Sequence, residues 1–103
     1  MPAKFMKMYQ FQLNNEYTKG AFLEASAKMD SFMKMHSGFE YRTLAQEADG
    51  QWLDTVYFTD RNSAESMEAA FTDSDVASEF MPMINGASVM ITTADIQTSA
   101  CNS

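Results

Sequence analysis

The fold is decided by residues 39–59, which read FEYRTLAQEADGQWLDTVYFT. Two extended runs, residues 39–48 and 51–59, are rich in aromatic and β-branched side chains and are separated by Asp49-Gly50. Asp-Gly between such runs predicts a β-hairpin, because both residues tolerate the positive φ of a type I′ turn.

A two-residue turn predicts a register for this hairpin, with Ala48 opposite Gln51, Thr43 opposite Val56 and Arg42 opposite Tyr57. Apolar side chains then occupy both of its faces. We expect one face to carry Leu44, Leu53 and Tyr57, and the other to carry Tyr41, Trp52, Val56 and Phe58.

On the amino-terminal side of the hairpin, Lys4 to Leu13 alternates between two faces and is predicted as a strand. Asn14 or Asn15 is predicted to cap an amphipathic helix that runs to about His36. Gly38 is predicted to supply the left-handed cap at the end of that helix.

On the carboxyl-terminal side, Asn62 and Glu65 have the spacing of a capping box and predict a second helix. Residues 72–75 interrupt it. A short further helix contains Pro82, which is expected either to kink that helix or to end it just before. Residues 87–98 are predicted as the last strand.

This order of elements predicts an α+β fold of the ferredoxin-like β-α-β-β-α-β kind, in one domain spanning residues 1–103. It gives a four-stranded antiparallel sheet with helices on one face and the first and third strands in the centre. The uncovered face is predicted to be apolar and therefore to need a cover. We expect a second copy of the chain to provide it, in a symmetric homodimer.

The composition agrees with such an assembly. The chain has 103 residues, of which 46% are hydrophobic and 13% aromatic, including ten Met and eight Phe. A small domain buries a modest share of its surface. The surplus of apolar side chains therefore predicts a subunit interface or a ligand cavity.

Charge and cysteine content exclude other classes. The formal net charge is −7, and no Lys or Arg follows Arg61. Such a surface repels phosphate groups, so we expect neither a nucleic-acid nor a membrane partner. With Cys101 as the single cysteine and no apolar run of about 20 residues, we expect a cytoplasmic protein. One histidine and one terminal cysteine argue against a transition-metal site.

Three segments resemble a known family: residues 37–42 (SGFEYR), 52–64 (WLDTVYFTDRNSA) and 80–84 (FMPMI). The chain resembles the dimeric α/β barrel superfamily, and within it proteins similar to antibiotic biosynthesis monooxygenases. It departs from them at Phe58, where family members more often have Trp.

The resemblance implies a barrel shared by two subunits, with a cavity between each sheet and its helices that holds small aromatic or polyketide-like molecules. It implies a small-molecule-binding protein similar to cofactor-independent monooxygenases, with no cofactor. Because one fold hosts many activities, a non-catalytic ligand-binding or structural homodimer and an isomerase or lyase remain alternatives.

Asp54 is the first candidate site residue, because a carboxylate on a central apolar strand either finds a partner or has its pKa raised. A raised pKa beside an aromatic cavity suits a general acid or base. The alternative is a structural aspartate bonded to a backbone amide, to Arg42 or to a tyrosine. We group Tyr57 with Asp54 as catalytic.

The predicted substrate-binding residues are Gln10, Tyr41, Trp52 and His36. Polar groups such as Gln10 are expected to orient substrate oxygens. For His36, the only histidine, the alternative role is a favourable cation at a helix C-terminus. Stacking on a flat substrate is predicted for aromatic side chains, with core packing as the alternative: Tyr9, Tyr41, Trp52, Tyr57 and Phe58.

Overall fold

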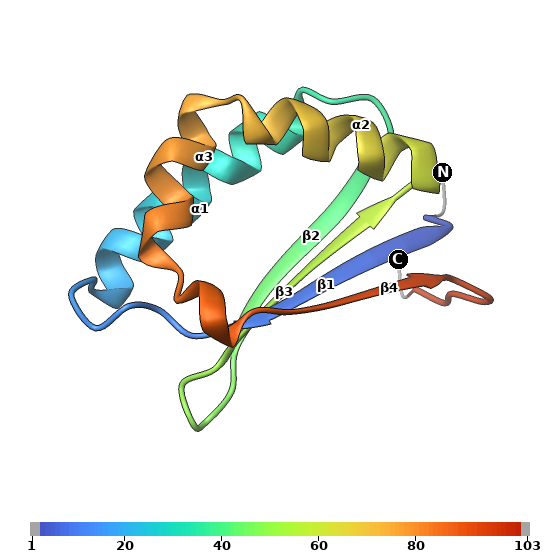
Figure 1. Ribbon diagram of the computed structural model, residues 1–103. Helices are drawn as coiled ribbons and strands as arrows, with labels where there is room; N and C mark the ends of the chain where they lie inside the picture. The colour runs from blue at the N-terminus through green and yellow to red at the C-terminus, as the bar shows by residue number, and fades with distance from the viewer. Residues whose placement is uncertain (1–2, 102–103) are drawn as a thin grey trace.

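A four-stranded antiparallel sheet with helices on one face forms the frame of the computed structural model, which describes residues 3–101 (Figure 1). The elements in chain order are β1 (Phe5–Phe11), α1 (Lys19–Lys34), β2 (Phe39–Gln46), β3 (Trp52–Phe58), α2 (Arg61–Thr72), α3 (Asp75–Phe80) and β4 (Met90–Asp95). The strand order β2-β3-β1-β4 puts β1 and β3 in the centre, and the predicted ferredoxin-like fold is confirmed.

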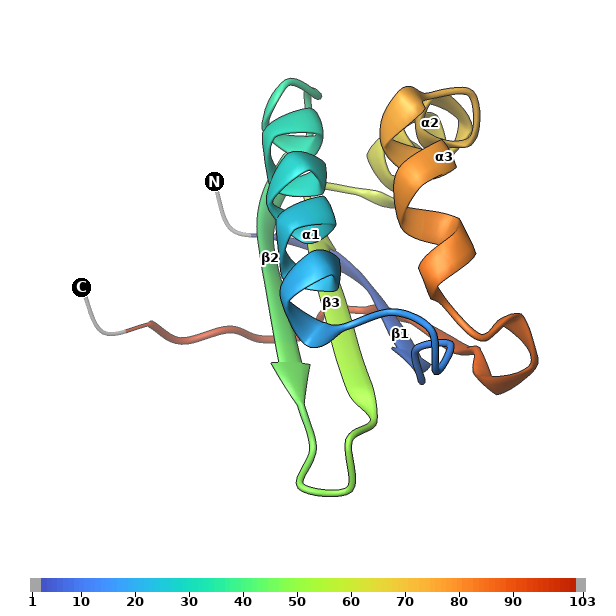
Figure 2. The same ribbon diagram turned by 90° about the vertical axis from the view of Figure 1, so that its left-hand side faces the viewer.

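The helices divide the covered face between them. In Figure 2, α1 lies over β2 and β3, whereas α2 and α3 lie toward β1. Phe22 of α1 is fully buried in the core. Its ring lies 5.8 Å from that of Phe11, 4.8 Å from that of Trp52 and 5.1 Å from that of Phe80, measured between centroids.

The hairpin register differs from the predicted one by one residue. Glu47 donates its amide to the carbonyl of Gln51 (2.8 Å), so the loop has three residues instead of two. Among the described residues positive φ is confined to Gly38 and Gly50, so Asp49 does not adopt the type I′ conformation. A three-residue loop with glycine in the left-handed region is the next most common hairpin connection.

This slip exchanges the two faces of β2, because successive side chains of a strand point to opposite sides. Arg42 lies opposite Val56 instead of Tyr57, and Leu44 lies opposite Asp54. Arg42 and Leu44 therefore face the helices. Tyr41 pairs with Tyr57 on the open face, so its predicted place beside Trp52 was wrong.

Two helix caps also differ from the predictions. Thr18, not an asparagine, caps α1, and its Oγ1 accepts from the Ala21 amide (3.1 Å). Asp60, not Asn62, caps α2 by accepting from the Ser63 amide (2.8 Å). Thr18 and Asp60 both have the extended backbone that an N-cap requires.

The end of α1 and the last strand also depart from expectation. Lys34 is the last residue of α1 and Met35 its C-cap, so Gly38 lies in the turn beyond the helix. The helix α3 ends before Pro82, one of the two predicted outcomes. Two short 3-10 turns, Met81–Met83 and Gly86–Ser88, then lead to β4, which is shorter than predicted and exposed along its length.

Gly38 is where the turn after α1 meets the start of α2. Its φ is +87°, and a Cβ built there would lie 2.0 Å from Oγ of Ser63. Both the backbone conformation and the close approach require glycine. Glycine therefore lets the start of α2 lie close to the segment that leads into β2.

Candidate active site

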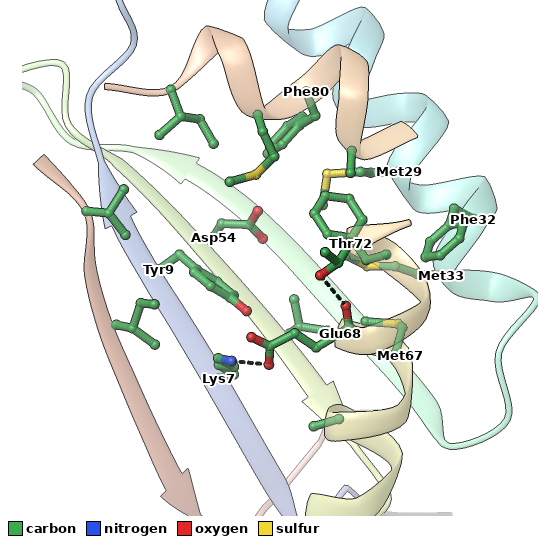
Figure 3. A pocket seen from close by; sticks show the side chains of 18 of the residues that line it. Lys7, Tyr9, Met29, Phe32, Met33, Asp54, Met67, Glu68, Thr72 and Phe80 are labelled. Atoms are coloured by element: carbon green, nitrogen blue, oxygen red, sulfur yellow. Dashed lines mark hydrogen bonds and ion pairs between the residues drawn. The ribbon is translucent and has the colours of Figure 1, made fainter. Parts of the chain in front are cut away.

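A cavity of about 350 Å³ lies between the sheet and the helices. Strands β1, β3 and β4 and all three helices contribute to its walls (Figure 3). Most of the lining side chains are apolar, many of them Phe, Met, Val or Ile. The five lining residues with polar side chains are Lys7, Tyr9, Asp54, Glu68 and Thr72.

Strand β1 brings two of these polar groups into the cavity. Its alternate residues Phe5, Lys7, Tyr9 and Phe11 share the face that carries the helices, because they pair with the helix-facing residues of β3. Lys7 lies opposite Val56, and Tyr9 lies opposite Asp54. A lysine thus occupies a position where the strand pattern calls for an apolar residue.

Lys7 pairs with Glu68 across the cavity. Its Nζ lies 2.5 Å from Oε2 of Glu68, which stands on α2. The two partners differ in environment, since the Lys7 side chain is 13% exposed and that of Glu68 is 52% exposed. Burial by itself lowers the pKa of Lys7, but the hydrogen bond to Glu68 and the interaction with Tyr9 outweigh it and raise that pKa above 10.5.

Tyr9 completes this polar group. Its ring centroid lies 5.4 Å from the Lys7 ammonium, and its hydroxyl points toward the Lys7–Glu68 pair in Figure 3. Burial raises the pKa of Tyr9 above its ordinary 10.0, and the charge of Lys7 opposes that shift without cancelling it. The phenol therefore keeps its proton at neutral pH and is a hydrogen-bond donor there.

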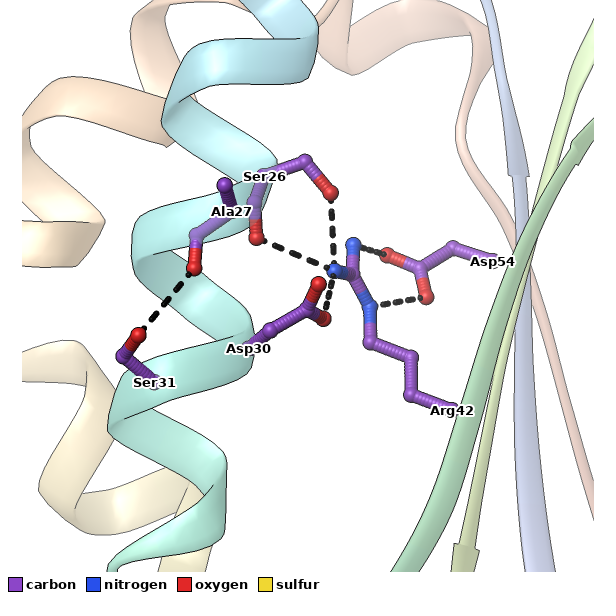
Figure 4. Close-up of polar contacts among 6 residues, drawn as sticks. All are labelled: Ser26, Ala27, Asp30, Ser31, Arg42 and Asp54. Atoms are coloured by element: carbon purple, nitrogen blue, oxygen red, sulfur yellow. Dashed lines mark hydrogen bonds and ion pairs between the residues drawn. The ribbon is translucent and has the colours of Figure 1, made fainter.

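Asp54 lines the cavity and also belongs to a second polar group, which joins β2 and β3 to α1 (Figure 4). Arg42 donates to both carboxylate oxygens, at 2.9 Å from Nε and 2.8 Å from Nη2. The Nη1 atom of Arg42 also donates to Asp30 and to the hydroxyl of Ser26, each at 2.8 Å. The side chains of Arg42 and Asp54 are only 3% and 4% exposed.

This pairing is the structural alternative considered for Asp54. Burial by itself lowers the pKa of Arg42, but the hydrogen bonds and charges of Asp54 and Asp30 outweigh it and raise that pKa above its ordinary value. Arg42 therefore remains a cation. Each oxygen of Asp54 accepts one hydrogen bond from Arg42, so a ligand proton competes for this carboxylate with a charged, bidentate partner.

The structure brings few of the other predicted site residues to this cavity. Trp52 is buried on the helix-facing side, but its ring packs on Phe22 and beneath Lys19. Tyr57, Tyr41 and Gln10 lie on the open face, where the rings of Tyr41 and Tyr57 are 5.9 Å apart.

His36 lies just beyond the end of α1, away from the cavity lining. Its Nδ1 is 2.9 Å from the carbonyl oxygen of Phe32, and its ring lies 4.5 Å from the Phe32 ring. Its surroundings are thus those of the helix C-terminus, the alternative considered for this residue.

Sequence reasoning did not single out Lys7 or Glu68. A signal for Lys7 was present, because it alternates with Phe5 and Tyr9 on an otherwise apolar strand face. No comparable signal pointed to Glu68, which is 61 positions away from Lys7 in the chain. In the described part of the chain no three His, Cys, Asp or Glu side chains converge as metal ligands. No helix there is both long and apolar enough to span a bilayer.

Solved structures share this arrangement of sheet and helices. In fold, the chain is similar to the cofactor-independent oxygenase SnoaB. That Streptomyces nogalater protein matches with a TM-score of 0.79 at 14% identity, over 95% of this chain and 97% of its own. No protein-family model matches the chain, and neither does any curated protein sequence.

Two further structures extend the comparison. The monooxygenase ActVA-Orf6 of Streptomyces coelicolor, solved with nanaomycin D, has a TM-score of 0.69 at 14% identity over 98% of this chain and 94% of its own. A dimeric ferredoxin-like protein from an uncultured marine organism has a TM-score of 0.74 at 6% identity, over 99% and 95%. At identities this low, the structural similarity shows a shared fold and nothing more. At the level of the fold, the predicted resemblance is confirmed.

Proposed function

We propose that this chain binds a flat, largely apolar small molecule in the cavity and oxidises it as a cofactor-independent monooxygenase. The observation that carries the proposal is the cavity itself. A volume of about 350 Å³, with mostly apolar walls and a few convergent polar groups, is typical of a small-molecule site. The fold shared with an oxygenase and a monooxygenase supports the choice of reaction.

The proposed substrate is an oxygen-bearing ring compound with an acidic ring methylene. Loss of one methylene proton gives a carbanion, which adds O₂. Loss of water then leaves a carbonyl, so one oxygen atom enters the product and the other leaves as water. The methylene supplies all four electrons. The apolar walls contribute desolvation and orientation.

Asp54 remains the proposed base or orienting group, because it lines the cavity. Its test is the variant Asp54→Asn, which keeps the size of the side chain. A folded Asp54→Asn protein with the wild-type rate removes Asp54 from the mechanism.

The homodimer is part of the proposal. In the described part of the chain the face of the sheet opposite the helices carries no helix. This open face displays Met6, Met8, Leu53 and Tyr57, and one similar structure is a dimer. We place Tyr57, Tyr41 and Gln10 at this interface. A monomer in sedimentation at micromolar concentration contradicts the dimer.

The decisive experiment combines binding with oxygen uptake. Nanaomycin D serves as the binding probe, and a tricyclic hydroxyketone with a ring methylene serves as the substrate probe. Ala64 of α2 lines the cavity, so Ala64→Leu is expected to fill it and to weaken binding about tenfold or more. Ala69→Leu, on the exposed side of the same helix, is the matched control.

Stoichiometric oxygen consumption in the wild type and in Ala69→Leu, lost in Ala64→Leu, supports the proposal. Equal binding by all three proteins contradicts the cavity as the ligand site. A second candidate function is non-catalytic ligand binding, which the full engagement of Asp54 by Arg42 favours. Tight binding of the probe without oxygen uptake is the outcome that selects it.

A further inference from the structure

The cavity wall contains a cation. Of the described residues that line the cavity, Lys7 is the only lysine or arginine. It stands on the central strand β1, between the apolar side chains of Phe5 and the ring of Tyr9. A cation buried in such surroundings requires a counter-charge, because leaving it unpaired is costly.

Its counterion in this structure is easily replaced. Glu68 approaches Lys7 from α2 with a side chain that is half exposed, so its carboxylate can turn to solvent at low cost. Lys7 has no such freedom, since its side chain is mostly buried on a rigid strand. The Lys7 ammonium therefore stays in the cavity wall, whereas the Glu68 carboxylate can be replaced by another anion.

No other residue described next to Lys7 takes the place of Glu68 as its counterion. Asp54 on β3 is held by Arg42 through both oxygens. Thr93, which lies opposite Lys7 on β4, is uncharged. Tyr9 lies on the same face of β1, and its hydroxyl points toward the same point in the cavity.

We infer that the cavity selects ligands with an acidic ring hydroxyl, a phenol or an enol, and binds them as the oxyanion against Lys7 Nζ and the Tyr9 hydroxyl, in place of Glu68. This inference deepens the proposed function and rests on it, since it names the chemical class of the cavity ligand. The ammonium supplies charge and the protonated Tyr9 supplies a donor, which together stabilise the anion. The hydroxyl proton leaves to solvent.

The test uses two flat probes that differ at one group, 2-hydroxyanthraquinone and 2-methoxyanthraquinone. The hydroxyl probe absorbs at longer wavelength once ionised, so its spectrum reports the bound form. At a pH where the free hydroxyl probe is protonated, the wild type is expected to bind it with the spectrum of the anion. The methoxy probe reports occupation of the cavity alone.

Two variants separate the cation from its counterion. Lys7→Met is expected to weaken binding of the hydroxyl probe by roughly ten- to a hundredfold and to abolish the spectral shift. Its affinity for the methoxy probe is expected to stay within about twofold of wild type. Glu68→Gln removes the competing anion and is expected to increase the affinity for the hydroxyl probe by about two- to fivefold.

The double variant Lys7→Met/Glu68→Gln controls for repulsion by an unpaired Glu68, and it too is expected to bind the hydroxyl probe weakly and without the shift. Recovery of the shift in the double variant overturns the inference. Equal wild-type binding of both probes with no spectral change also overturns it, while leaving the cavity as a ligand site. If the wild type binds neither probe, the proposed function falls as well.

Discussion

Around Phe22 the side chains of α1 and the sheet fill the space between them (the filled half), whereas the part bounded by α2, α3 and the adjoining side of α1 (the hollow half) holds a cavity of about 350 Å³. The helix α1 buries five residues, among them Phe22 and Ala25. The helix α2 buries Ala64 and Met67, and β4 beyond it is exposed throughout. Close packing is therefore concentrated in one half of this small domain, and the proposed ligand site lies in the other.

The polar groups follow the same division. In the filled half, Arg42 is buried and paired within the protein to Asp30 and to Asp54, whose side chain also borders the cavity. In the hollow half, Lys7 is paired to a half-exposed Glu68 that a ligand can replace. The Arg42 ion pairs, which are formed entirely within the protein, suit a structural role. The Lys7–Glu68 pair, whose carboxylate a ligand can replace, suits a binding site.

The largest expected effect is in the filled half. Phe22→Ala removes a fully buried ring that packs on three others and is expected to cost about 5 kcal/mol of unfolding free energy. Phe71→Ala, in the cavity wall, is expected to cost about 1 kcal/mol, because that ring already borders empty space. Urea unfolding at fixed protein concentration measures both. Equal losses of unfolding free energy in the two variants contradict the difference in packing between the two halves.

Arg42→Met tests the buried polar group. It leaves Asp54 charged and without its partner, and the expected cost is about 3–5 kcal/mol. The double variant Arg42→Met/Asp54→Leu removes the stranded charge and is expected to recover most of that loss. Urea unfolding of both proteins decides the point, and a single variant as stable as wild type refutes the framework role.

Gly38→Ala tests how the hollow half is anchored. We expect a loss of about 2–3 kcal/mol, since alanine is strained at φ +87° and its Cβ meets Ser63. Gly50→Ala is the control, because Gly50 has φ +96° with open space around it, and strain alone costs about 1 kcal/mol. If the clash with Ser63 causes the larger loss at Gly38, the double variant Gly38→Ala/Ser63→Gly is more stable than Gly38→Ala in thermal unfolding. A double variant no more stable than Gly38→Ala contradicts that cause.

The smallest effect is a pH dependence at Tyr9. Its pKa in the folded chain is above 10.0, so from about pH 10 upward the unfolded chain loses this proton first and stability falls. The raised pKa of Lys7 acts in the same direction above 10.5. Tyr9→Phe is expected to flatten the decline of the urea midpoint between about pH 9 and 11. Parallel profiles for the two proteins contradict this assignment.

Much of the fold was predictable because the signals are local. Alternation along β1 and β3 and the helical spacing around Phe22 depend on residues a few positions apart. The hairpin register was not predictable in the same way. Asp49-Gly50 is compatible with a two-residue and a three-residue loop, and these differ by a small free energy that packing of β2 decides.

That one-residue difference had the largest consequence for the candidate site. It moved Arg42 to the helix-facing side, where it reaches Asp54, and it moved Tyr41 away from Trp52. Pairing with Arg42 was among the alternatives for Asp54. The contact of Lys7 with Glu68 lay outside any local pattern.

The amino-acid sequence by itself determined the elements, their order and the supply of apolar side chains, because periodicity and turn chemistry act over a few residues. The tertiary structure alone decided which charges meet and where space is left unfilled. Those outcomes depend on side chains far apart in the chain, brought together by strand register and by the close approach of α2 to Gly38.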